Sequence, residues 1–292
     1  MKLFGKTILL KKRSCSVDGT PGVRLLPEVN LYVRVTNGCN ACCKFCSNYA
    51  NAGRSVSFNR AKLLRVLDEL EENGIAINRL SITGGEPGTV RGLVEDVLSD
   101  LSDGHYRDVP VTLATNGLSD DSRALIRHRR WNEVCLSVHH YDYARMAEAY
   151  GLDIKVERFD FSDLPFGKVA FSCNLIKGLI DSPHEMLRMM EFAHENRIKS
   201  LGFVELMPVN DFCRAHLVKI DNLDLEGLNH LIKDCENKRD GVCRCRNYLH
   251  SKGGETLSVY VRAMLNPQYC ESSLLYDGEN LRQGFHSDNV II

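Results

Sequence analysis

Apolar residues follow two alternating periods between residues 30 and 207. Short runs rich in Val, Ile and Leu, such as VPVTLAT at 109–115, are typical of strands that are buried on both faces. Other stretches, such as SFNRAKLLRVLDELEEN at 57–73, carry apolar residues three or four positions apart, as amphipathic helices do. A repeated order of strand and helix predicts parallel strands with helices outside the sheet.

This pattern predicts an α/β fold, a partial (β/α)6 TIM-like barrel with a small C-terminal extension. Roughly six strand–helix units fit before residue 210, fewer than the eight of a closed barrel. The expected strands are 30–36, 79–83, 109–115, 133–138, 168–176 and 200–207. The expected helices are 57–73, 91–102, 119–130, 141–150 and 182–197.

Beyond about residue 218 the regular alternation stops. We expect a helix near 223–235 and a strand at 256–264 there. The chain is therefore divided into an N-terminal extension (1–29), a barrel (30–215) and a C-terminal region (216–292).

Composition limits the possible functions. A net charge of −1 does not support a broad surface for nucleic acid or membrane. No apolar run is long enough to span a bilayer, and the N-terminal residues lack a signal-peptide pattern. Twelve cysteines in such a chain favour metal or catalytic chemistry in a reducing compartment, and we expect the cytoplasm.

Four of the cysteines lie in CNACCKFC at 39–46. Cys39, Cys43 and Cys46 form C-x3-C-x2-C directly after a predicted strand, and Cys42 lies outside this frame. Three thiolates can ligate three irons of a [4Fe–4S] cluster and leave the fourth iron open to a substrate or cofactor. A structural zinc ion normally takes four ligands, and a redox dithiol needs no third cysteine upstream.

The loop, with an aromatic residue at Phe45, resembles the C-x3-C-x-aromatic-C signature of the radical S-adenosylmethionine (SAM) superfamily. The resemblance covers roughly residues 30–210. It implies a [4Fe–4S] cluster on Cys39, Cys43 and Cys46 that binds SAM and cleaves it reductively. The deoxyadenosyl radical that this produces abstracts hydrogen from a substrate. It also implies a flavodoxin or a ferredoxin as electron donor.

Later motifs extend the resemblance. GGEP at 84–87 matches the glycine-rich motif that contacts the amino group of SAM, and its glycines allow close backbone approach. Other candidate SAM contacts are polar or apolar residues at predicted strand ends, where α/β barrels place their chemistry. His139 and His140 follow a strand and could contact substrate, although a histidine there is more often structural. The candidate SAM-binding residues are Gly84, Gly85, Glu86, Pro87, Thr115, Ser137, Ser172, Asn174 and Met207.

A second cysteine group lies in the C-terminal region: Cys235, Cys243, Cys245 and Cys270. Four thiolates could ligate an auxiliary [4Fe–4S] cluster, as in SPASM/twitch-like extensions, or a zinc ion. The alternative is that some of them are buried cysteines without a ligand role.

Within the superfamily, the chain is most similar to the branch of the molybdenum-cofactor GTP 3′,8-cyclase. It differs from that cyclase where arginines would bind a triphosphate: Tyr32 and SSLLY at 272–276 occupy those places. We therefore expect a different substrate, a peptide or a natural-product precursor. The alternatives are a nucleotide-modifying enzyme like the cyclase and a non-catalytic iron–sulfur or zinc protein.

Overall fold

The computed structural model groups the chain into two compact units, and each is considered by itself. Unit 1 comprises 1–40, 48–134 and 267–292, and unit 2 comprises 41–47 and 135–266. The described residues are 2–8, 28–48, 57–152, 161–165, 167–225, 228, 231–233, 245–264, 273–284 and 289–292.

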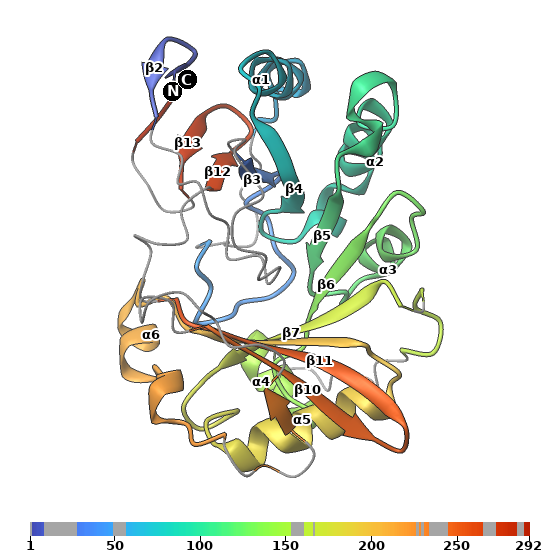
Figure 1. Cartoon of the computed structure of the whole chain (residues 1–292), viewed down its shortest axis with the longest axis vertical. Helices are drawn as coiled ribbons and strands as arrows, with labels where there is room; N and C mark the ends of the chain where they lie inside the picture. Colours follow the sequence, from blue (N-terminus) through green and yellow to red (C-terminus); the bar gives the residue numbers. More distant parts are fainter. Residues whose placement is uncertain are drawn as a thin grey trace. The chain divides into compact units, whose positions relative to one another are not determined.

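Unit 1 contains a mainly parallel sheet (Figure 1). Strands β3, β4 and β5 are parallel neighbours, β12 lies parallel to β3, and β13 closes that side antiparallel to β12. The strands are β3 (Glu28–Arg34), β4 (Ala76–Thr83), β5 (Val111–Thr115), β12 (Ser273–Tyr276), β13 (Leu281–Gln283) and the hairpin β1 (Lys2–Leu3) and β2 (Lys6–Thr7). The helices are α1 (Arg60–Glu72), α2 (Arg91–Asp100), α3 (Asp120–Ile126) and the 3-10 helices η1 (Pro87–Val90) and η2 (Gly104–Asp108).

Local sequence explains why these segments form. In β3 every second residue is buried, which is the strand period. Helix α1 begins after Asn59, whose side-chain oxygen accepts a hydrogen bond from the backbone N–H of Lys62 at 2.9 Å. Its buried residues recur at helical spacing and face the core: Leu63, Val66, Leu67 and Leu70.

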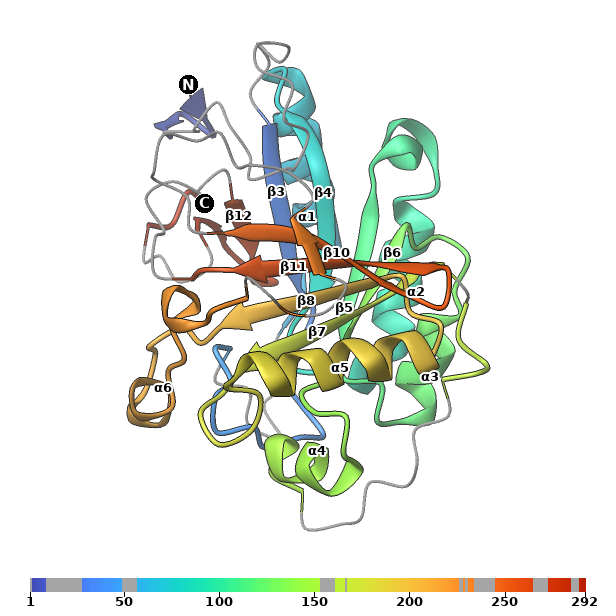
Figure 2. The ribbon, with the colours of Figure 1, turned by 60° about the horizontal axis from the view of Figure 1, so that its bottom comes forward.

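Unit 2 contains a second group of strands. Strands β7 and β8 are parallel, β11 is parallel to β8, and β10 and β9 continue antiparallel to the edge. Helix α5 lies along this sheet (Figure 2) and buries a row of methionines. The strands are β7 (Val169–Leu175), β8 (Ser200–Glu205), β9 (Leu231–Lys233), β10 (Arg246–Lys252) and β11 (Glu255–Arg262). The helices are α4 (Tyr143–Tyr150), α5 (Pro183–Glu195), α6 (Asp211–Ala215) and the 3-10 helix η3 (Ile220–Asn222).

Strand β6 (Glu133–Ser137) begins in unit 1 and ends in unit 2. The predicted α/β fold with parallel strands is confirmed. Strands β13 and β9 are edge strands of their units, so the described strands do not close into a full barrel.

One predicted element is wrong. Instead of a helix near 223–235, the structure has strand β9 at Leu231–Lys233. These three residues pair with Tyr248, Leu249 and His250 of β10, and this pairing outweighs the helical periodicity of an isolated segment. The predicted strand at 256–264 is present as β11, although it pairs in parallel with β8. The division at residue 215 stays a prediction.

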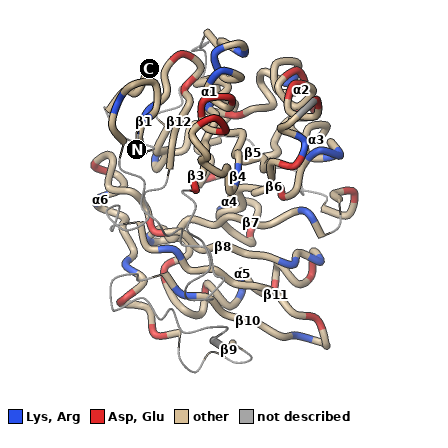
Figure 3. Tube along the Cα trace, turned by 45° about the horizontal axis from the view of Figure 1, so that its top comes forward, with Lys and Arg blue, Asp and Glu red and all other residues tan. Residues whose placement is uncertain are grey.

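The helices of unit 1 contain charged residues of both signs, whereas β5 contains none (Figure 3). Arg60 of α1 pairs with Asp96 at 2.7 Å and with Asp100 at 2.8 Å, which joins α1 to α2. Among the described helices, none is long and apolar enough to cross a membrane.

Candidate functional site

The backbone of the glycine-rich motif lies directly against the residues that lead into the cysteine loop. The N–H of Gly85 donates to the carbonyl of Thr36, and the N–H of Glu86 donates to the carbonyl of Gly38, both at 2.7 Å. A Cβ at Gly85 would lie 1.9 Å from the carbonyl oxygen of Gly38, so this approach requires glycine. The predicted motif therefore contacts the segment immediately before Cys39.

The first and last residues of the motif, Gly84 and Pro87, are also held by close contacts. Gly84 has a φ of 159°, and a Cβ there would lie 2.5 Å from the carbonyl oxygen of Thr36. Its own carbonyl accepts a hydrogen bond from Asn48 Nδ2 at 2.6 Å. Pro87 is buried and begins the 3-10 helix η1, where its fixed φ suits the first helical position.

Glu86 is 1% exposed, and both oxygens of its carboxylate accept hydrogen bonds within unit 1. Oε1 accepts from the backbone N–H of Gly88 (3.1 Å) and from the hydroxyls of Thr115 (2.6 Å) and Ser122 (2.9 Å). Oε2 accepts from the backbone N–H of Asn116 at 2.7 Å. Burial raises the pKa of Glu86, and the four hydrogen bonds act in the opposite direction. Glu86 and Thr115 thus tie the motif to the end of β5.

Asn116 follows Thr115 and was not among the residues predicted to form the site. Its Nδ2 lies 2.8 Å from Asn40 Oδ1 and 3.8 Å from Cys39 Sγ, so it contacts the first cysteine of the loop. The sequence signal was its place in ATNG, directly after a predicted strand end. That position alone did not reveal a partner 77 residues away.

The other end of the cysteine loop belongs to unit 2 and is held by apolar contacts. Phe45, between Cys43 and Cys46, is 8% exposed. Its ring packs in a cluster that also contacts the partly buried Cys43. The other buried members of this cluster are Ala149, Ile176, Leu206 and Cys213.

Two side chains near α6 bind consecutive carbonyls of this loop. Asn210 Nδ2 donates to the carbonyl of Lys44 at 3.0 Å, while its Oδ1 accepts from the N–H of Cys213 at 2.8 Å. The thiol of Cys213 lies 3.7 Å from the carbonyl oxygen of Phe45. Burial raises the pKa of Cys213, which keeps its thiol protonated and able to donate. Cys213 is thus a contact of the loop backbone.

His139 joins this loop to β7. Its ring centroid lies 4.9 Å from that of Phe45 in an edge-on arrangement, and its Nδ1 accepts from the N–H of Asn174 at 3.3 Å. Burial lowers the pKa of His139 to about 4, so the ring is neutral at pH 7. His139 therefore has a structural contact on each side. Ser172 and Asn174 share the less buried face of β7.

The remaining predicted contacts lie at or just beyond strand ends in unit 2. Ser137 is the last residue of β6, and its carbonyl accepts a hydrogen bond from the hydroxyl of Tyr150. Met207 follows β8 by two residues, and its carbonyl accepts from the N–H of Val209 at 2.8 Å. Their predicted role as SAM contacts stays a prediction.

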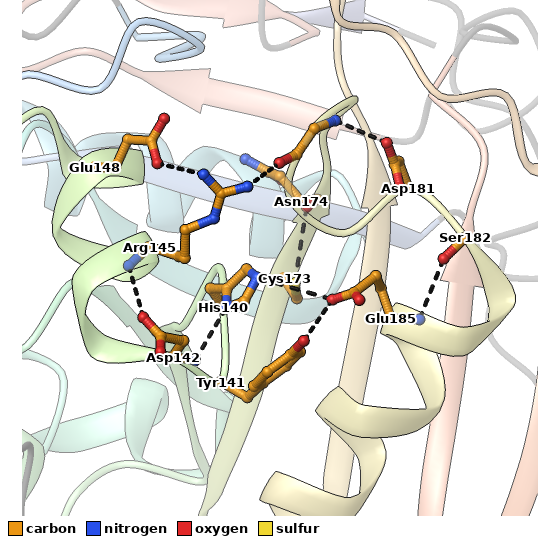
Figure 4. Close-up of polar contacts among 11 residues, drawn as sticks. His140, Tyr141, Asp142, Arg145, Glu148, Cys173, Asn174, Asp181, Ser182 and Glu185 are labelled. Carbon is orange, nitrogen blue, oxygen red and sulfur yellow. Dashed lines mark hydrogen bonds and ion pairs between the residues drawn. The ribbon is translucent and has the colours of Figure 1, made fainter.

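A cavity of about 430 Å³ opens beside the loops that follow β6 and β7. Figure 4 shows polar contacts among several of the residues that line it. The carboxylate of Glu185 accepts from the hydroxyl of Tyr141 at 2.7 Å and faces His140 Nε2 at 3.9 Å. The guanidinium of Arg188 lies over the Tyr141 ring, 4.5 Å from its centroid. Burial lowers the pKa of His140. A cavity of this size suits a small ligand or one side chain. Its other lining residues are Asp142, Arg145, Gly178, Leu179 and Asp181.

The second cysteine group is described only in part. Cys235, Cys243 and Cys270 lie outside the described residues, and Cys245 is partly buried just before β10. The predicted auxiliary cluster therefore stays a prediction.

The thiols of the cysteine loop have the chemistry that an iron–sulfur cluster needs. Cys39, Cys43 and Cys46 are partly buried, and none of them forms a disulfide. Thiolate sulfur is the ligand that such clusters prefer, and an amide N–H already points to one of the three sulfurs. Across the described residues, no three Cys, His, Asp or Glu side chains are already arranged around a metal position. The three thiols are chemically suited to a [4Fe–4S] cluster, and their role as its ligands stays a prediction.

The described strands and helices define an α/β protein with mainly parallel strands. A loop with three candidate iron–sulfur ligands, Cys39, Cys43 and Cys46, follows strand β3. Residues 33–159 match the family model of the Radical SAM superfamily. This part of the chain is therefore a radical SAM domain. No curated protein matches the chain.

Several solved structures are similar in part. SuiB of Streptococcus suis, bound to the precursor peptide SuiA, is 18% identical over 64% of this chain, with a TM-score of 0.48. A radical SAM methyltransferase from Sphaerobacter thermophilus is 18% identical over 62% of this chain and 56% of its own, with a TM-score of 0.48. The enzyme anSMEcpe with bound AdoMet and the Cp18Cys peptide is 17% identical over 61% of this chain and 50% of its own, with a TM-score of 0.41. The match spans only 42% of the length of SuiB.

Proposed function

We propose that this protein cleaves SAM reductively at a [4Fe–4S] cluster held by Cys39, Cys43 and Cys46, and that it modifies a peptide or a natural-product precursor. Cys39, Cys43 and Cys46 would hold the cluster, which would supply the electron for reductive cleavage of SAM and so allow hydrogen abstraction from the substrate. A flavodoxin or a ferredoxin supplies the electron in the cytoplasm.

One observation supports this proposal most strongly. The glycine-rich motif, where the amino group of SAM would bind, is hydrogen-bonded through Gly85 and Glu86 to the segment that ends at Cys39. Of the proposed cluster ligands, Cys39 is therefore close in the chain to backbone that contacts the glycine-rich motif within unit 1. A protein that only stored or sensed a cluster would have no need for this contact.

The chain's own residues position these groups. Glu86 and Thr115 orient the motif, and Phe45 anchors the loop between Cys43 and Cys46. Further SAM contacts are proposed at Ser137, Ser172, Asn174 and Met207, at or near the carboxyl ends of β6, β7 and β8.

The choice of a peptide or natural-product precursor rests on two supports. The first is the C-terminal cysteine group, in which Cys235, Cys243, Cys245 and Cys270 are proposed to ligate an auxiliary [4Fe–4S] cluster. Such extensions are frequent in peptide-modifying members of the superfamily, which is an argument by analogy. The second is the lack of arginines where the related cyclase would bind a triphosphate, because guanidinium groups are natural triphosphate partners.

The proposal is tested by anaerobic reconstitution with iron and sulfide. We expect about eight irons per chain if both clusters form and about four if only the loop cluster forms. Incubation with SAM and dithionite should release 5′-deoxyadenosine. The Cys43→Ala variant should lose the loop cluster and this activity together. A wild-type protein that holds its loop cluster but releases no 5′-deoxyadenosine would contradict the enzymatic proposal.

The substrate class needs its own experiment. The reconstituted enzyme is incubated with short-peptide libraries and with nucleoside triphosphates, and deuterium transfer into 5′-deoxyadenosine is measured by mass spectrometry. Transfer from a deuterated peptide supports the proposal. Transfer from deuterated GTP alone would replace it with a nucleotide-modifying reaction.

A further inference from the structure

The amide of Asn116 has a fixed orientation. Its Oδ1 accepts a hydrogen bond from the backbone N–H of Leu118 at 3.0 Å. Nδ2 must then point the other way, toward Asn40 Oδ1 at 2.8 Å and Cys39 Sγ at 3.8 Å. An amide nitrogen carries two hydrogens, so both contacts can form at once. The amide is therefore a hydrogen-bond donor to the sulfur of Cys39.

The backbone of Asn116 is held as firmly as its side chain. Its N–H donates to the buried carboxylate of Glu86 at 2.7 Å, and that carboxylate also binds Thr115 and Ser122. Asn116 is itself 8% exposed. Because Glu86 belongs to the glycine-rich motif, one network runs from that motif through Asn116 to the first cysteine.

We propose that Asn116 sets the reduction potential of the loop cluster by donating a hydrogen bond to the thiolate of Cys39. This inference rests on the proposed function, since it requires a cluster on Cys39. Reduction adds negative charge to the cluster and its sulfur ligands. An N–H donor to one of those sulfurs stabilises the reduced form and raises the potential. Asn116 is thus a positioning residue that acts through Cys39.

The test compares three variants of the full chain after anaerobic reconstitution. Asn116→Ala removes the donor, and Asn116→Asp keeps the side-chain size and the acceptor for Leu118 but places an oxygen toward Cys39. Ser122→Ala is the matched control, because it removes one hydrogen bond to Glu86 from the same network without a contact to Cys39. The potential of the loop cluster is measured by a redox titration followed by electron paramagnetic resonance.

Asn116→Ala should lower the reduction equilibrium constant about tenfold, which for a one-electron couple is about 59 mV toward more negative values. Asn116→Asp should lower it further, and Ser122→Ala should leave it unchanged even if it destabilises the fold. A purely structural Asn116 would instead give the same potential in Asn116→Ala, in Ser122→Ala and in the wild type, and this result would overturn the inference. The proposed function has a separate readout, because it fails if the wild type binds no cluster.

Discussion

The two ends of the cysteine loop are held by interactions of different kinds. Before Cys39, backbone hydrogen bonds and the buried carboxylate of Glu86 define the position of the chain. Between Cys43 and Cys46, the ring of Phe45 packs in an apolar cluster, with Asn210 and Cys213 on adjacent carbonyls. Hydrogen bonds in a buried network require each partner, whereas apolar packing tolerates changes that preserve volume.

The two ends of the loop should respond differently to mutation. At the first end, small changes of shape or of hydrogen-bonding pattern should be costly. At the second end, the loss of volume should matter most, and a conservative apolar replacement should be accepted.

Phe45→Ala should destabilise unit 2 by about 4 kcal/mol, because it removes a buried ring and leaves a cavity. Phe45→Leu should cost much less, since it keeps most of the apolar volume. Amide hydrogen exchange followed by mass spectrometry should show faster exchange at 41–47 in Phe45→Ala and nearly wild-type exchange in Phe45→Leu. Equal effects of the two replacements would mean that this end is not held by packing.

Gly85→Ala should destabilise unit 1 by about 3 kcal/mol, because its Cβ would meet the carbonyl oxygen of Gly38 at 1.9 Å. One added methyl group should be destabilising at Gly85, whereas a conservative apolar replacement should be tolerated at Phe45. Gly92→Ala is the matched control: nothing lies within 4 Å of its Cβ, and alanine in α2 should be neutral or stabilising. Urea unfolding of the purified variants distinguishes them. A Gly85→Ala protein as stable as Gly92→Ala would show that the motif does not need this close approach.

The contrast between the two ends also explains what the sequence could predict. The alternation of strands and helices, the frame of Cys39, Cys43 and Cys46, and the place of GGEP at a strand end are local patterns, so they were predicted from short stretches. The partners of the loop are not local. Asn116 lies 77 residues from Cys39 and Asn210 lies 166 residues from Lys44, and only the folded chain brings them together.

The secondary structure of β9 also depends on a partner that is not adjacent in the sequence. Its residues have apolar spacing compatible with a helix, but they pair with Tyr248, Leu249 and His250 of β10. Periodicity within one segment does not show that a later segment will pair with it.

The two ends should also respond to pH in opposite directions. Burial lowers the pKa of His139 from 6.5 to about 4, so the unfolded chain binds a proton before the folded chain does. Stability from this residue is therefore present above pH 6.5 and is lost as the pH falls toward 4, by about 2 kcal/mol between pH 7 and pH 5. Burial raises the pKa of Glu86, so its contribution is instead lost as the pH rises through that pKa.

Urea unfolding between pH 5 and pH 7 measures the loss of stability that His139 causes. His139→Asn cannot titrate in this range, and its amide oxygen offers an acceptor for the N–H of Asn174. It should show less loss of stability on acidification than the wild type. An unchanged slope in His139→Asn would mean that another group causes the acid sensitivity.

Cys42→Ala should have the smallest effect, although Cys42 lies between the two ends and next to a proposed ligand. Its side chain is exposed, and its backbone N–H donates to the carbonyl of Tyr150 at 2.8 Å, a contact that alanine retains. The variant should keep the wild-type iron content and SAM cleavage, with a change in stability of about 0.5 kcal/mol or less. Cys43→Ala is the adjacent comparison and should lose the cluster. If Cys42→Ala also lost iron, the C-x3-C-x2-C frame would be wrong, and the ligand set would have to include the exposed thiol.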